Sequence, residues 1–200
     1  EIYTAQYTLS LHDALPIFRH ARDEIDALAR ETGEYAHLST EQHGLSVNLY
    51  KAKGDRAVGT DYQTRRLQKP DYLHFSATGK AILAHLPRDR VEEIIENHGL
   101  ERNTEHTVTD PEELFAALER IRERGYSTNE EEQVKGIYAI GAPILDDSGW
   151  ALGSLSVSGP VNRFQDEDYH DRIVGLVTET ANVIEVNVTT DEAGDLPNFP

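Results

Sequence analysis

The chain has 200 residues, of which 38% are hydrophobic and 28% charged, enough apolar material for the core of one domain. It contains no Cys, which excludes disulfides, thiolate nucleophiles and cysteine-based zinc sites. Its 36 Asp and Glu residues outnumber its 19 Lys and Arg residues, and the net charge of −17 argues against nucleic-acid binding by this chain alone.

The acidic residues are spread along nearly the whole sequence, and only five of the basic residues are Lys. A dispersed acidic surface is favoured in a cytoplasm of high salt, because salt screens the repulsion between like charges. We therefore predict that the denaturation midpoint rises between 0.01 M and 1 M salt, as the Debye length falls from about 30 Å to about 3 Å. A flat or falling midpoint would support the alternative, an acidic protein from a mesophile.

The sequence shows no secretory signal pattern and no apolar run approaching the roughly 20 residues that cross a bilayer. We expect a cytoplasmic protein with no membrane partner. Residues 1–17 lack a sustained helix or strand period. They resemble a peptide encoded by sequencing-adapter DNA, so we expect them to be non-native and dispensable for stability. A genuine short arm or helix is the alternative.

Regular hydrophobic periods begin at Phe18. Apolar residues recur at helical spacing as far as Ala29, and Gly33 is a typical stop, which predicts a helix over residues 18–33. Three strands are predicted next, at residues 35–39, 45–50 and 56–60. In the second, Leu45, Val47 and Leu49 alternate with polar residues, and a predicted hairpin turn at residues 41–44 separates it from the first.

Three helices are predicted in the middle of the chain, at residues 77–85, 89–97 and 111–124. The third has the clearest start, with Asp110 as N-cap, Pro111 at the first helical position and Glu113 as the reciprocal capping residue. Ser76 is a candidate N-cap for the first of the three.

The C-terminal part begins with two predicted strands, 137–145 and 150–158, joined by a tight turn. A long helix is predicted over residues 173–188, and the polar segment 191–200 is expected to be a flexible tail. Because hairpins as well as helices connect the strands, the pattern favours an α+β fold with an antiparallel sheet over a doubly wound parallel sheet.

No P-loop, dinucleotide-binding glycine pattern, HExxH or GxSxG motif is present. The nine His residues show no close pair at ligand spacing on one helix, so no metal site is predicted. A serine hydrolase built on Ser156 or Ser158 is an alternative, and it would need a His and an acid within hydrogen-bond reach of one hydroxyl. The acidic run at residues 129–132 is interpreted as a solvated loop rather than as a pair of catalytic carboxylates.

Two features together predict a pocket for a small carboxylate. Residues 76–79 place small side chains at a helix N-terminus, where free backbone N–H groups favour an anion. Ser156 and Ser158 lie two residues apart on one predicted strand, so their hydroxyls face the same way. Such a pocket binds its ligand without a base that activates a nucleophile. In the alternative interpretation, the serines are ordinary polar residues that face solvent.

Five segments occur in the order and spacing seen in the IclR family of transcriptional regulators. They are Ser76–Ala84, Ile121–Ser127, Glu131–Gly136, Ile140–Ile144 and Leu155–Pro160. The chain resembles the family's effector-binding domain over about residues 22–188. This resemblance implies a GAF-like or profilin-like domain over residues 34–190, with a curved antiparallel sheet flanked by helices. It also implies that residues 18–33 are the linker helix and that the family's winged helix-turn-helix domain is missing.

The resemblance further implies ligand sensing rather than catalysis, without a cofactor. In family members that bind small organic acids, the ligand contacts backbone amides at the positions of Ala77 and Thr78. It also contacts side chains at four further positions, which here are Asn129, Ala139, Ser156 and Ser158. An acid is common at the position of Asn129 and a thiol can occur at that of Ala139, so these two departures bear on the identity of the effector.

The predicted function is that of the ligand-sensing domain of a transcriptional regulator, not of an enzyme. The small-molecule effector would control DNA binding by the missing domain, in a homodimer or tetramer. A free-standing GAF-like signalling module and the small serine hydrolase are the alternatives.

Overall fold

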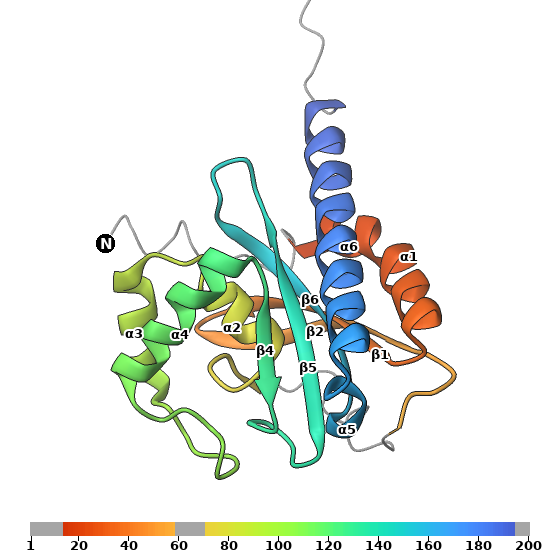
Figure 1. The fold of residues 1–200 in the computed structure, drawn as a ribbon. Coiled ribbons are helices and arrows are strands. Elements are labelled where there is room, and N and C mark those ends of the chain that lie inside the picture. Colours follow the sequence, from red (N-terminus) through yellow and green to blue (C-terminus); the bar gives the residue numbers. More distant parts are fainter. Residues whose placement is uncertain (1–13, 59–70, 195–200) are drawn as a thin grey trace, which may run out of the picture.

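The computed structural model describes residues 14–58 and 71–194. Within these ranges six strands form one antiparallel sheet, in the order β3-β2-β1-β6-β5-β4 (Figure 1). The strands are β1 (Tyr35–Gln42), β2 (Leu45–Lys53), β3 (Asp71–Tyr72), β4 (Ser127–Glu130), β5 (Ile137–Leu145) and β6 (Ala151–Pro160). The helices are α1 (Ala14–Thr32), α2 (Ala77–Leu83), α3 (Arg88–His98), α4 (Pro111–Arg124), α5 (Val161–Phe164) and α6 (Glu167–Gly194). The predicted antiparallel α+β fold is confirmed.

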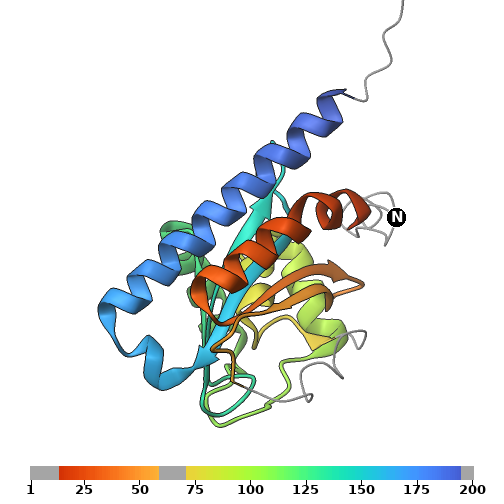
Figure 2. The same cartoon turned by 90° about the vertical axis from the view of Figure 1, so that its right-hand side faces the viewer.

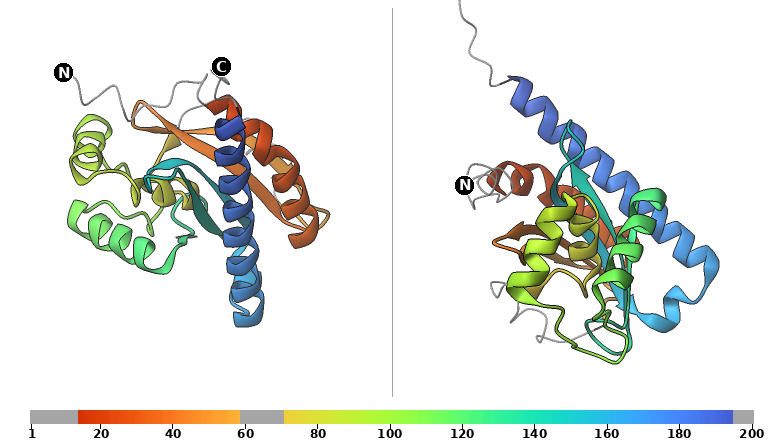
Figure 3. Two further views of the ribbon diagram at one scale, coloured as in Figure 1. Left: turned by 90° about the horizontal axis from the view of Figure 1, so that it is seen from above. Right: turned by 90° about the vertical axis from the view of Figure 1, so that its left-hand side faces the viewer.

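Helices cover both faces of the curved sheet. α1 and α6 lie side by side over one face, as Figure 2 shows from that side. α2, α3 and α4 lie on the opposite side (Figure 3). Because side chains alternate along a strand, Ala36 and Leu38 of β1 join the apolar core under α1 and α6, whereas His37 and Ser39 face α2. A second apolar core forms among α2, α3 and α4.

Local signals in the sequence set the turns and helix starts. His43 and Gly44 form the two-residue turn between β1 and β2, with φ angles of 54° and 81° that match the twist of a tight hairpin. The Asp110 side chain accepts a hydrogen bond from the backbone N–H of Glu113 at 2.9 Å, which confirms the predicted cap of α4. The Ser76 hydroxyl caps α2 in the same way, accepting from Gly79 at 3.0 Å.

Two predicted helix boundaries and one predicted strand differ from the structure. α1 begins at Ala14, and Ile17 is only 1% exposed in the core, so the last residues assigned to a dispensable segment pack with the domain. Residues 1–13 lie outside the described residues. α6 continues to Gly194, four residues into the predicted tail, and residues 56–58 do not form the strand predicted there. Pro16 lies in the first turn of α1, where the helix does not use backbone N–H groups, so this residue does not mark the start of the domain.

Among the described residues, no helix is both long enough and apolar enough to cross a membrane.

Candidate functional site

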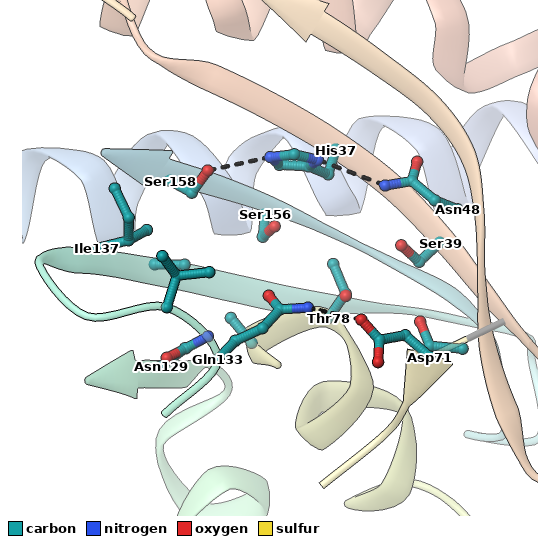
Figure 4. A pocket seen from close by; sticks show the side chains of 14 residues that line it. His37, Ser39, Asn48, Asp71, Thr78, Asn129, Gln133, Ile137, Ser156 and Ser158 are labelled. Carbon is teal, nitrogen blue, oxygen red and sulfur yellow. Dashed lines mark hydrogen bonds between the residues drawn. The ribbon is translucent and has the colours of Figure 1, made fainter. Parts of the chain in front are cut away.

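A cavity of about 100 Å³ lies between the polar face of the sheet and the start of α2 (Figure 4). All six strands, α2 and the loop between β4 and β5 contribute to it. Its lining is mostly hydroxyl, amide and imidazole groups: His37, Ser39, Ser46, Asn48, Asp71, Ala77, Thr78, Asn129, Gln133, Val134, Ile137, Ala139, Ser156 and Ser158. This cavity is somewhat smaller than the roughly 150 Å³ that holds benzene, so it suits a small metabolite of a few heavy atoms.

The structure brings all six predicted site residues to this cavity. Ala139 of β5 pairs with Asn129 on one side and with Ser158 on the other, which sets these residues in one row across the sheet. Ser156 and Ser158 are 4% and 7% exposed, so the interpretation of these serines as solvent-facing is wrong. Their hydroxyls share one face of β6 because residues two apart on a strand point the same way.

Two glycines make room for the backbone at the start of α2. A Cβ at Gly79 would lie 2.1 Å from the carbonyl oxygen of Leu73, and a Cβ at Gly141 would lie 3.0 Å from that of Ala77. No real Cβ atom tolerates the first of these distances. The absence of a side chain at Gly79 therefore lets the segment between β3 and α2 pack against the first turn of α2, and its absence at Gly141 lets β5 approach Ala77.

Two serines of the sheet fix that first turn. Ser127 Oγ donates to the carbonyl of Ala77 at 2.6 Å, and Ser154 Oγ donates to the carbonyl of Thr78 at 2.9 Å. Among the described residues, no hydrogen bond uses the backbone N–H of Ala77 or Thr78. These two amides line the cavity and are therefore available to donate to a ligand.

Asn129 is a hydrogen-bond donor to the cavity. Its Oδ1 accepts the backbone N–H of Glu132 at 2.9 Å, which leaves its NH2 group for a ligand. Asn129 and Glu132 are 3% and 6% exposed, so the interpretation of residues 129–132 as a solvated loop is wrong at both positions. Sequence analysis missed β4 because this four-residue strand is polar and has no apolar alternation.

Glu132 forms a buried ion pair with Lys80 of α2. Desolvation lowers the pKa of the Lys80 ammonium and raises the pKa of the Glu132 carboxyl, although the attraction between the two groups opposes both shifts. Glu132 Oε2 is buried and has no hydrogen-bond partner among the described residues. The pair ties the loop after β4 to α2 on the same side of the cavity as Asn129.

Further polar contacts hold this loop in place. Thr107 Oγ1 donates to the carbonyl of Glu132 at 2.8 Å. Gln133 Nε2 donates to Asp71 Oδ2 at 3.0 Å, which joins the loop to β3 (Figure 4). The cavity is thus closed by side chains from segments that are far apart in the sequence.

His37 is a lining residue that sequence analysis did not single out. Its Nε2 lies 3.0 Å from Ser158 Oγ, and its Nδ1 lies 3.4 Å from the amide of Asn48 (Figure 4). Burial and then the positive charge of Lys51 lower the pKa of His37 to about 3, so its imidazole is neutral at pH 7.

The signal for these missed residues was present in the sequence. His37 and Ser39 lie two residues apart on one strand, and Ser46 and Asn48 do so on the next, as Ser156 and Ser158 do on β6. The same alternation argument, applied to the first two predicted strands, would have placed them on one sheet face.

The cavity offers hydrogen bonds rather than full positive charge. None of its fourteen lining residues is Lys or Arg, and Asp71 is the one carboxylic acid among them. A bound anion would therefore be held by the amides of Ala77, Thr78 and Asn129 and by serine hydroxyls.

The site does not build a serine hydrolase triad. His37 is within hydrogen-bond reach of Ser158, but its other ring nitrogen faces Asn48 and not an acid. A pKa of about 3 also makes the ring a weak base, whereas general base catalysis favours a pKa near the working pH. Across residues 14–58 and 71–194, no group of three His, Asp or Glu side chains is placed to hold a metal ion.

We expect His37 to make stability fall with acid. Its pKa is about 3 in the folded chain against an ordinary value of 6.5, so between these values the unfolded chain binds more protons. The free energy of unfolding should then decrease as pH falls from 6.5 toward 3, by roughly 1–3 kcal/mol, because the cavity leaves the ring half-buried. Urea denaturation between pH 7 and 4 tests this against His37→Phe, which should show a flatter profile. Identical slopes for the two chains would contradict it.

Comparison with known proteins adds a family match. The family model described as bacterial transcriptional regulator IclR C-terminal matches residues 9–186. The probable HTH-type transcriptional regulator ArcR of Halobacterium salinarum is 38% identical over 174 residues, 87% of this chain and 66% of that protein. The chain spans between half and two thirds of the length of the first curated relatives it matches.

Solved structures show the same fold. The C-terminal domain of the Escherichia coli regulator KdgR has a TM-score of 0.75 and 30% identity, covering 86% of this chain and 98% of that one. The inducer binding domain of the transcription factor PobR from Acinetobacter, a double mutant in complex with 3-hydroxybenzoic acid, has a TM-score of 0.73 and 25% identity. That match covers 84% of this chain and 96% of the PobR chain.

Proposed function

This chain belongs to the IclR family of bacterial transcriptional regulators, and we propose that its cavity is the site where a small organic acid controls the full-length protein. The convergence of six residues on one cavity carries the proposal, because three separate segments of the chain supply them: α2, β4 with β5, and β6. If the resemblance to the family had arisen by chance, nothing would bring these separate segments together at one cavity.

The hydrogen-bond donors of the site suit a carboxylate. Ala77, Thr78 and Asn129 line the cavity, and no hydrogen bond among the described residues uses the backbone N–H of Ala77 or Thr78. The NH2 group of Asn129 is left for a ligand because its Oδ1 accepts from Glu132. A neutral amide at Asn129 repels an anion less than an acid at that position would. The PobR domain in complex with 3-hydroxybenzoic acid supports an organic acid as the class of ligand.

The proposal extends to the whole protein. Its curated relatives include the probable HTH-type regulator ArcR, so we propose that a DNA-binding domain outside this chain acts on the target genes. This chain would serve as the sensor within a cytoplasmic homodimer or tetramer. The effector would shift the equilibrium between the DNA-bound and the released state of the protein, because it would bind one state more tightly than the other.

Serine substitutions test the site. We expect Ser156→Ala and Ser158→Ala each to weaken binding of a small organic acid by about 0.5–1.5 kcal/mol, and by up to about 3 kcal/mol where the hydroxyl contacts a charged group. Calorimetry with a panel of small organic acids measures this, and Ser148→Ala in the exposed β5–β6 turn is the matched control. Both cavity variants should stay folded by circular dichroism. Unchanged affinity in the double variant would remove the serines from the site.

A further inference from the structure

The direction of the Ser158 hydroxyl depends on a side chain outside the six residues assigned to the effector site. His37 Nε2 lies 3.0 Å from Ser158 Oγ, close enough for one hydrogen bond. Ser158 donates that bond if Nε2 carries a lone pair, and accepts it if Nε2 carries a proton. The tautomer of His37 therefore decides what Ser158 presents to a ligand.

Asn48 decides the tautomer. In the orientation drawn in Figure 4, its amide nitrogen lies 3.4 Å from His37 Nδ1. With the amide turned, the nitrogen donates to the carbonyls of Tyr50 at 2.8 Å and Leu38 at 3.2 Å, and the oxygen takes the place beside Nδ1. Two bonds to backbone carbonyls outweigh one long contact, because the unturned amide leaves its oxygen facing those two carbonyl oxygens.

An amide oxygen beside Nδ1 favours the tautomer in which Nδ1 carries the proton. Nε2 then holds a lone pair and accepts the Ser158 Oγ–H. The proton of Ser158 thus points at His37, and the lone pairs of its oxygen point into the cavity. Burial also holds the pKa of His37 far below neutrality, which prevents a second proton on the ring from reversing this arrangement.

Asn129 and Ser158 lie at the two ends of a row across the sheet, and Asn129 presents hydrogen-bond donors where Ser158 presents an acceptor. Asn129 Oδ1 is occupied by the backbone N–H of Glu132, so Asn129 presents only its NH2 donors. Asn129 and Ser158 flank Ala139, two strand spacings apart, or roughly 10 Å between backbones. A ligand that lies over the Ala139 methyl would meet donors at one end and an acceptor at the other.

We propose that His37 is a positioning residue that makes Ser158 a hydrogen-bond acceptor, and that the effector is a hydroxy acid. Its carboxylate lies toward Asn129 and the start of α2, and its hydroxyl donates to Ser158. This inference rests on the proposed function of the cavity. An oxo acid would bring lone pairs against the lone pairs of Ser158, and a deoxy acid would leave that buried acceptor unpaired.

The tautomer is measurable in the wild-type chain without any ligand. Nitrogen-15 NMR of the wild-type chain at pH 7 should show a protonated Nδ1 and an unprotonated Nε2 for His37. His37→Phe, which lacks this signal, assigns it among the nine His residues. If Nε2 is the protonated nitrogen, Ser158 is free to donate and the inference is overturned.

Ligand selectivity is the second test. Calorimetry compares lactate, pyruvate and propionate, and 3-hydroxybenzoate with benzoate, in wild type and in His37→Phe. We expect each hydroxy acid to bind wild type at least tenfold more tightly than its oxo or deoxy partner. The preference for lactate over pyruvate should fall below threefold in His37→Phe, because Ser158 is then free to donate to the oxo group and pyruvate gains affinity. A merely structural His37 would weaken all acids equally, which overturns the inference. Failure of every acid to bind wild type counts against the proposed function itself.

Discussion

Replacement of Lys80 by Met is expected to lower the free energy of unfolding by about 3–5 kcal/mol at pH 7. Met fills most of the space of the Lys stem but removes the only ionic partner of Glu132 that the structure describes. The Glu132 carboxylate is 8% exposed at its side chain and already has one oxygen without a partner, so the loss leaves a buried charge with little compensation. Chemical denaturation in high salt measures the difference from wild type.

The pH dependence of this variant identifies the cause. Without Lys80, the pKa of Glu132 stays raised by burial, so the folded chain binds more protons than the unfolded chain above the ordinary pKa of 4.5. Stability of Lys80→Met should therefore fall further as pH rises from 5 to 8. The double variant Lys80→Met/Glu132→Leu should recover most of the loss, because it removes both charges.

An exposed ion pair provides the matched control. Lys135 contacts Glu105 at 2.8 Å, and their side chains are 66% and 68% exposed. Solvent screens such a pair, so Lys135→Met should leave the denaturation midpoint nearly unchanged. Equal losses in Lys80→Met and Lys135→Met would show that burial of the Lys80–Glu132 pair does not set its contribution.

Gly79→Ala is expected to destabilise the domain by about 3 kcal/mol or more. A Cβ at this position would lie 2.1 Å from the carbonyl oxygen and 2.6 Å from the Cα of Leu73. Both are backbone atoms, so the clash cannot be relieved by rotating a side chain. Helix propensity alone favours Ala over Gly by about 1 kcal/mol, and the expected loss is what remains after that gain.

Gly175 of α6 is the matched control for the same substitution. Apart from the neighbouring backbone of α6 itself, no described heavy atom lies within 4 Å of the position that its Cβ would take. Gly175→Ala should therefore stabilise the chain by about 0.5–1 kcal/mol, the helix propensity difference. Thermal denaturation should show a lower midpoint for Gly79→Ala and a higher midpoint for Gly175→Ala than for wild type. A stabilising effect of Gly79→Ala would contradict the close contact between Gly79 and the backbone of Leu73.

Local sequence signals were sufficient for most of the secondary structure. Asp110 with Pro111 set the start of α4, and the Asp146–Gly149 turn set the β5–β6 hairpin, because these signals act within four residues of one another. Hairpin connections then favoured the antiparallel sheet that the structure has. The short polar strand β4 escaped this reasoning, since nothing local distinguishes it from a loop.

The candidate site could also be predicted only in part from the sequence. From the residues alone, only the small side chains that begin α2 and the paired Ser156 and Ser158 could be placed on one pocket. Asn129 and Ala139 came from the resemblance to the IclR family. That all of them meet at one cavity is visible only in the folded chain, where cross-strand pairing sets Asn129, Ala139 and Ser158 in one row.

The sequence by itself determined most of the helices and strands, the antiparallel class and the shared face of the two serines, because each follows from contacts within a few residues. The tertiary structure alone decided which polar groups are buried and what they face. Lys80 meets Glu132 across 52 positions and His37 meets Ser158 across 121. The protonation and hydrogen-bonding role of such groups depends on partners and desolvation that exist only after the sheet and α2 have packed together.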